Sequence, residues 1–130
     1  MSQIKIEHIA MYVADLEKAK LFFEKYFNAK SGEKYHNKAT GFMSYFLEFS
    51  GEARLEIMTR AELSEKDKST YPKGFHHIAL SVGSKEVVDS ITEQLRFDGY
   101  EIISNPRTTG DGYYESCIAD SEGNLIEVTI

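Results

Sequence analysis

Two histidines and two glutamates occupy repeated places in this 130-residue chain. His8 lies in Glu-His-Ile-Ala-Met-Tyr-Val, and His77 lies in His-His-Ile-Ala-Leu-Ser-Val, 69 positions later (77 − 8). Glu56 lies in Leu-Glu-Ile-Met-Thr, and Glu127 lies in Ile-Glu-Val-Thr-Ile, 71 positions later (127 − 56). Two imidazoles and two carboxylates form a charge-balanced ligand set for a divalent metal, with octahedral positions left for water or substrate. The duplication therefore predicts a metal site built from these four side chains.

The strand pattern around each histidine predicts where its side chain points. Alternate residues of a strand face opposite sides of the sheet. Within residues 6–13 one alternating set is large and apolar, which suits packing under a helix, so His8 falls on the other face beside the small Ala10. Within residues 76–82 the same alternation places His77 beside Ala79. The small neighbours are expected to leave space beside both imidazoles.

Each glutamate is a single carboxylate between large apolar residues of a strand. Burial of an unpaired carboxylate is costly, so its face of the strand must be wet or must offer a compensating charge. Two equivalent modules could be related by a pseudo-twofold axis, with the faces that carry His and Glu directed toward each other. One His and one Glu from each module would then lie close together. This arrangement would supply the compensation.

The elements that must position these residues also occur twice. Asp15 and Ser84 are expected N-caps of helices that follow the histidine segments, and Gly99 is expected to end the second helix. β-rich stretches follow at 42–49 and 54–59, and again at 113–119 and 125–130. The chain is predicted to be α+β, with a first module at 1–60, a linker at 61–74 and a second module at 75–130.

Composition excludes several classes of function. The formal net charge of −6, from 21 acidic and 15 basic residues, makes the chain a poor nucleic-acid binder. The N-terminus has no long apolar run, so neither a signal peptide nor a membrane span is expected. The single cysteine, Cys117, cannot form an intramolecular disulfide, so a cytoplasmic setting is predicted.

Other side chains of chemical interest receive more ordinary interpretations. His76 neighbours His77, so strand alternation sends it to the opposite face in a structural role. His36 lies in a polar stretch and is expected to be exposed, and Cys117 is expected to be a small buried residue. Arg60 and Arg107 could hold a substrate carboxylate or phosphate. An aromatic cleft could be formed by four tyrosines, Tyr12, Tyr45, Tyr113 and Tyr114.

Taken together and in order, these segments resemble the vicinal oxygen chelate superfamily, which includes glyoxalase I. The resemblance covers essentially the whole chain and rests on the segments at 8–19, 55–57, 76–82 and 120–128. Ser121 stands where the family commonly has proline. The resemblance implies tandem βαβββ modules that form a curved mixed sheet around a metal site. It also implies a homodimer, because in bacterial members the site often lies between two subunits.

The resemblance to glyoxalase I further implies a reaction. Its four ligands match His8, Glu56, His77 and Glu127, and they would hold Ni, Co, Zn, Mn or Mg. The expected activity is a lyase-type isomerisation in methylglyoxal detoxification: the hemithioacetal of a thiol and a 2-oxoaldehyde becomes a thioester through an enediolate. Glu127 is expected to be the catalytic base, with Glu56 as its pseudosymmetric counterpart.

Other members of the superfamily provide alternatives. An acyl-CoA epimerase keeps a similar ligand set and the same enolate chemistry, and a small-molecule (antibiotic) binding resistance protein would need no catalysis. Fosfomycin-resistance transferases usually lack a carboxylate at the position of Glu56. Tyr12 and Arg60 stand where glutathione-dependent bacterial glyoxalases tend to have Arg and Asn, so the thiol is left open. Tyr12, Arg60 and Arg107 are the candidate substrate-binding residues.

Overall fold

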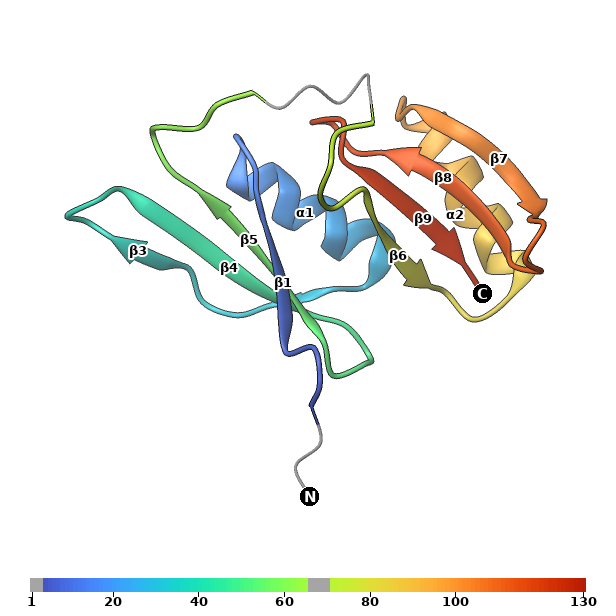
Figure 1. Ribbon diagram of the computed structural model, residues 1–130, viewed down its shortest axis with the longest axis horizontal. Helices are drawn as coiled ribbons and strands as arrows, with labels where there is room; N and C mark the ends of the chain where they lie inside the picture. Colours follow the sequence, from blue (N-terminus) through green and yellow to red (C-terminus); the bar gives the residue numbers. More distant parts are fainter. Residues whose placement is uncertain (1–3, 66–70) are drawn as a thin grey trace. The chain divides into compact units, whose positions relative to one another are not determined.

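The computed structural model describes residues 4–65 and 71–130. They divide into two compact units, with the boundary between Glu65 and Lys66. Each unit has its own sheet and its own helix (Figure 1). The predicted linker at 61–74 includes residues outside the described part of the chain, and it stays a prediction.

The first unit follows the order β1 (His8–Tyr12), α1 (Leu16–Phe27), β2 (Lys30–Ser31), β3 (Tyr35–Asn37), β4 (Phe42–Glu48) and β5 (Arg54–Thr59). Its strands are arranged β1-β5-β4-β2, and β3 also pairs with β4. β1 runs parallel to β5, whereas the other pairings are antiparallel. The sheet is therefore mixed, and the strands that carry His8 and Glu56, β1 and β5, are direct neighbours.

The second unit contains β6 (His77–Ser81), α2 (Lys85–Phe97), β7 (Ile102–Thr108), β8 (Tyr114–Ala119) and β9 (Leu125–Thr129). It has the same strand order as the first unit, with the single strand β7 where the first unit has the two short strands β2 and β3. Its strands are arranged β6-β9-β8-β7, with β6 parallel to β9. The expected α+β class with tandem βαβββ modules is confirmed, with β3 as an additional short strand in the first unit, and the strands form two mixed sheets, one in each unit.

The predicted caps define where both helices begin. The Asp15 carboxylate accepts the backbone N–H of Lys18 at 3.0 Å, and the Ser84 hydroxyl accepts that of Val87 at 3.3 Å. Asn28 caps the end of α1 with a left-handed φ of 55°, and Gly99 follows α2 with a φ of 92°. These ends fix the length of helix that covers each sheet.

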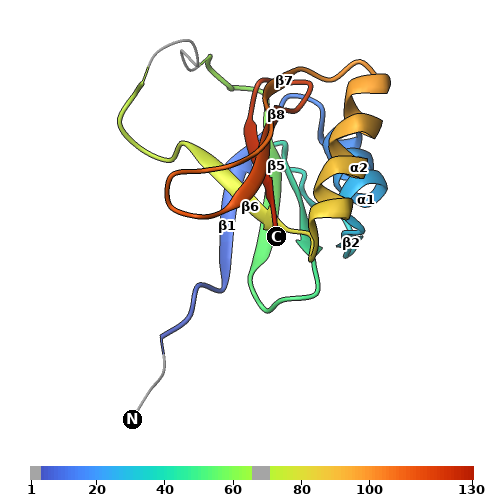
Figure 2. The same ribbon diagram turned by 90° about the vertical axis from the view of Figure 1, so that its right-hand side faces the viewer.

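One face of each sheet is buried under its helix. In the first unit α1 packs against β4 and β5, and Phe23, Leu47 and Ile57 are fully buried. In the second unit α2 packs against β7, β8 and β9, and Figure 2 shows α2 running along one side of these strands. Because strand residues alternate, the intervening side chains project from the face that the helix leaves uncovered. Neither helix in the described residues is long and apolar enough to span a membrane.

Candidate functional site

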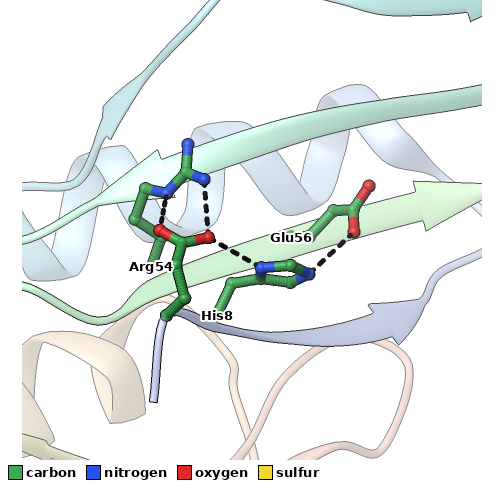
Figure 3. A network of polar contacts seen from close by, with 4 residues as sticks. His8, Arg54 and Glu56 are labelled. Atoms are coloured by element: carbon green, nitrogen blue, oxygen red, sulfur yellow. Dashed lines mark hydrogen bonds and ion pairs between the residues drawn. The ribbon is translucent and has the colours of Figure 1, made fainter. Parts of the chain in front are cut away.

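The first unit brings His8 and Glu56 together on the face of its sheet opposite α1. In the parallel pairing of β1 with β5, Ala10 lies opposite Glu56, so the imidazole two residues earlier on β1 reaches along the strand toward the carboxylate. His8 Nε2 lies 3.7 Å from Glu56 Oε1 (Figure 3). The neighbours of Glu56 on β5, Leu55 and Ile57, are buried, while the Glu56 side chain is 15% exposed. The predicted alternation is confirmed for β5, whereas Ile9 on β1 is 38% exposed.

The second unit repeats this pair in the same register. Ala79 on β6 lies opposite Glu127 on β9, and His77 Nε2 lies 3.2 Å from Glu127 Oε1. The His77 side chain is 34% exposed and that of Glu127 is 25% exposed. Both carboxylates are therefore partly exposed to solvent, and each has an imidazole as a neighbour. These two features compensate for the cost of burying a carboxylate.

The spacing within each pair suits two ligands of one ion. Ligand atoms about 2.1 Å from a metal, at right angles to each other, lie about 3 Å apart. The N–O distance of 3.2 Å in the second unit is close to this value, and 3.7 Å in the first unit needs only a small approach. No group of three or more His, Cys, Asp or Glu side chains within the described residues could by itself hold a metal ion. Each unit therefore presents one imidazole and one carboxylate, here called a half-set, at a spacing that fits two ligands of a divalent metal.

The imidazole of His8 has further polar contacts that the sequence did not reveal. Its Nδ1 lies 2.8 Å from Glu7 Oε1, and Glu7 in turn receives two hydrogen bonds from Arg54 (Figure 3). These contacts, first Arg54 and then His8, lower the pKa of Glu7 to about 2. Glu7 is therefore ionised beside the imidazole at all ordinary pH values.

Glu115 and Cys117 are the residues near Glu127 that sequence reasoning missed. Cys117 pairs directly with Glu127 between β8 and β9, and Glu115 is two residues before it on the same face. Burial, followed by the charge of Glu127 and a hydrogen bond with it, raises the pKa of Glu115. Burial, followed by the charges of Glu127 and Glu115, raises the pKa of the Cys117 thiol to about 11. Cys117 is half-buried rather than fully buried, and alternation along β8 could have placed both residues beside Glu127.

The prediction that His76 faces away from His77 was wrong. The two rings meet edge to face with centroids 5.1 Å apart, and their Nδ1 atoms are 2.8 Å apart. β6 begins only at His77, so strand alternation does not extend to His76. His36 is exposed on β3, as predicted.

Two of the three candidate substrate-binding residues lie together. Arg60 donates a hydrogen bond to Glu62 at 2.9 Å. That contact, and then a hydrogen bond with Tyr12, raises the pKa of Arg60. Tyr12 is 46% exposed at the end of β1. Arg107 belongs to the other unit, where it is exposed on β7 opposite Glu115.

Two of the four tyrosines that could have formed an aromatic cleft, Tyr45 and Tyr114, do not line one. Tyr45 is buried on the helix side of its sheet, where its hydroxyl donates to Glu17 on α1 at 2.9 Å. The Tyr114 hydroxyl donates to Asp89 on α2 at 2.6 Å. Both rings bind their own helices instead of lining an open face, whereas Tyr113 is largely exposed.

Comparison with known proteins agrees with this fold. A relative from Bacillus subtilis (strain 168), the uncharacterized protein YqjT, is 24% identical over 130 residues, covering 95% of this chain and 96% of the relative. The structure of a possible glyoxalase from Bacillus cereus is 26% identical, with a TM-score of 0.72, covering 98% of this chain and 100% of that one.

Two structures with lower sequence identity have the same fold. A glyoxalase family protein from Enterococcus faecalis is 20% identical, with a TM-score of 0.79 and 97% of both chains covered. The trypanothione-dependent glyoxalase I of Leishmania major is 18% identical, with a TM-score of 0.75, covering 98% of this chain and 86% of that one. The family model described as Glyoxalase/Bleomycin resistance protein/Dioxygenase superfamily matches residues 5–128. The chain belongs to this superfamily.

Proposed function

We propose that this protein is a metal-dependent isomerase of the glyoxalase I type, acting on the hemithioacetal of a thiol and a 2-oxoaldehyde. The observation that carries the proposal is the repeated His–Glu pair. Two units with different surrounding sequences keep an imidazole and a carboxylate in the same strand register and within 3.7 Å and 3.2 Å of each other. Surface polarity alone does not require this repetition.

In this proposal His8, Glu56, His77 and Glu127 hold one divalent ion, of which Ni, Co, Zn, Mn and Mg are the candidates. When bound, such an ion stabilises negative charge on two neighbouring substrate oxygens, as in an enediolate. The half-sets come either from one chain or from two chains of a homodimer. The two imidazoles would supply nitrogen ligands, and the two carboxylates would balance the charge of the ion.

Glu127 is proposed as the base that moves the proton. Its carboxylate takes the proton from the hemithioacetal carbon and returns it to the adjacent carbon, so the reaction is an isomerisation that needs no oxidant. Glu115 lies on the same face of the sheet as Glu127, and burial, followed by the charge of Glu127 and a hydrogen bond with it, raises the pKa of Glu115, so this carboxyl is the protein group next to the proposed base. Glu56 has different surroundings in the first unit. The residue opposite Glu56 on the neighbouring strand is Phe46, whereas the residue opposite Glu127 is Cys117.

Arg60 and Tyr12 are proposed to contact the thiol part of the substrate. Arg60 is partly exposed and already holds a carboxylate, that of Glu62, in a 2.9 Å contact, so it can exchange this partner for a substrate carboxylate. Arg107 is proposed as a second anion contact. We place the protein in the cytoplasm, where reduced thiols are available to form hemithioacetals.

The activity is tested with metal-loaded protein and hemithioacetals of methylglyoxal with several thiols. Glu127→Gln should lower kcat by roughly 10²–10⁴-fold, while Glu93→Gln, an exposed glutamate on α2, should leave it unchanged. Acyl-CoA epimers are assayed in parallel, because an epimerase would use the same base. If no hemithioacetal turns over and no substrate α-proton exchanges with deuterated water, the isomerase proposal is wrong.

The homodimer is a separate proposal that rests on membership of the superfamily and the short chain. Symmetric dimers are the commonest assemblies of soluble proteins. Sedimentation at micromolar concentration should give a mass about twice the 14.8 kDa of one chain. A single species with the mass of one chain would contradict the dimer and would require both half-sets to come from the same chain.

A further inference from the structure

A chain of contacts holds the His8 imidazole from the side opposite Glu56. Arg54 Nε donates to Glu7 Oε2 at 2.9 Å, and a second guanidinium nitrogen donates to Glu7 Oε1 at 2.7 Å. Glu7 Oε1 also lies 2.8 Å from His8 Nδ1. A bidentate guanidinium–carboxylate contact has a defined geometry, so it fixes the orientation of the Glu7 carboxylate toward the ring.

Three further contacts anchor this network to the sheet. The guanidinium of Arg54 lies over the Phe46 ring at 4.1 Å, and the same ring meets His8 edge to face at 5.2 Å. The backbone N–H of Arg54 donates to the carbonyl of Glu7 at 2.9 Å, which extends the pairing of β1 with β5. Figure 3 shows that Arg54 and Glu56 lie on either side of the His8 ring.

The second unit lacks this network. The position matching Glu7 holds His76, and the position matching Arg54 in the strand register holds Leu125. His77 therefore has an imidazole, not a carboxylate, beside its Nδ1. The clamp on His8 is a feature of one copy and is not required by the duplicated fold.

The partner of one imidazole nitrogen determines the state of the other. A carboxylate beside Nδ1 favours a proton on Nδ1, which leaves the Nε2 lone pair free to bind a metal. We propose that Glu7, held by Arg54, is a positioning residue that keeps His8 in the Nδ1–H tautomer and presents Nε2 beside Glu56 as a metal ligand. This inference rests on the metal-binding function proposed above, and it adds two residues to the machinery of that site.

A purely structural role makes a different prediction. Glu7 and Arg54 form an exposed ion pair, and such pairs contribute little to stability. The chain offers a matched control in Glu52, which forms another exposed ion pair, with Lys5 at 3.0 Å, but has no histidine contact among those found. Removing either exposed carboxylate should affect folding little, whereas only the removal of Glu7 should affect His8.

The test compares wild type with Glu7→Ala, Glu7→Gln, Arg54→Leu and the control Glu52→Gln. Proton–nitrogen NMR of the metal-free protein at about pH 9 reports the tautomer of neutral imidazoles. Wild type and Glu52→Gln should show His8 protonated on Nδ1, and Glu7→Ala should move the proton to Nε2. Competition titration with Zn²⁺ should show affinity reduced about 10–100-fold in Glu7→Ala. Glu7→Gln and Arg54→Leu should give smaller losses.

Wild-type His8 protonated on Nε2, or a Glu7→Ala protein with unchanged tautomer, would overturn the inference. An equal loss of Zn²⁺ affinity in Glu52→Gln and Glu7→Ala would also overturn it, because the effect would then be general. If wild type binds no metal, the proposed function fails, but the tautomer measurement still decides whether Glu7 positions His8. Arg54→Leu introduces the residue type that the second unit has at the matching position, Leu125, and that unit folds with a leucine there.

Discussion

A buried pair of hydroxyls holds α2 on its sheet, and its removal gives a prediction with a clear order of stabilities. Thr92 and Ser116 are fully buried, and their oxygens are 2.7 Å apart. Thr92 Oγ1 also donates to the carbonyl of Val88 at 2.7 Å, so its proton is already used. Ser116 must then donate to Thr92. Ser116 lies on β8 between Glu115 and Cys117, so this contact helps to place both residues beside Glu127.

The two single substitutions therefore differ in cost. Thr92→Val leaves the Ser116 donor buried without its partner, which costs about 1–3 kcal/mol. Ser116→Ala leaves Thr92 bonded to Val88, so only one hydrogen bond is lost, at about 0.5–1.5 kcal/mol. The double variant has neither hydroxyl, so it should be more stable than Thr92→Val alone.

Urea unfolding of the four proteins, arranged as a double-mutant cycle, measures these free energies. The far-UV signal should give Thr92→Val the lowest midpoint. If the double variant is less stable than Thr92→Val by the full cost of Ser116→Ala, the hydroxyls act independently and the reasoning is refuted.

Three further predictions follow from the structure. Arg54 and His8 lower the pKa of Glu7 to about 2, below its usual 4.5. Any stability from the ionised Glu7 carboxylate is therefore present above about pH 4.5 and is lost as the pH falls through 2. Carboxyl carbon NMR should give a titration midpoint near 2 for Glu7 in wild type and a higher midpoint in Arg54→Leu. Because the Cys117 thiol has a pKa of about 11, its alkylation by iodoacetamide should be slow at pH 8 and should rise up to about pH 11; fast labelling at pH 8 would contradict this burial. Asn28→Gly should retain α1 or stabilise it slightly, and Asn28→Val should lower the urea midpoint, because the φ of 55° at this position disfavours β-branched residues.

The paired half-sets could be predicted from the sequence because two signals coincide there. Strand alternation placed His8 and Glu56 opposite the apolar face, and the second copy repeated the result with His77 and Glu127. The helix caps at Asp15 and Ser84 were predictable because capping is local and depends on one side chain and a nearby backbone N–H.

The residues that surround the His–Glu pairs were harder to predict. Glu7 and Arg54 are 47 positions apart and meet only because β1 pairs with β5 in one particular register. His76 was misplaced because the first residue of β6 could not be read from the pattern to within one position. β7 was not predicted from the residues: it contains Pro106 and two register irregularities, which remove the alternation on which the prediction depends.

The measurement that tests the central claim most directly is the metal content of the purified protein. After equilibrium dialysis against Ni²⁺ or Zn²⁺, elemental analysis should find one divalent ion per wild-type chain. The double variant Glu56→Gln with His77→Ala, which removes one ligand from each pair, should retain none under the same conditions. The control double variant His36→Ala with Glu93→Gln changes the same residue types at exposed positions and should bind like wild type. Undiminished metal in the Glu56→Gln, His77→Ala protein would contradict the four-ligand site.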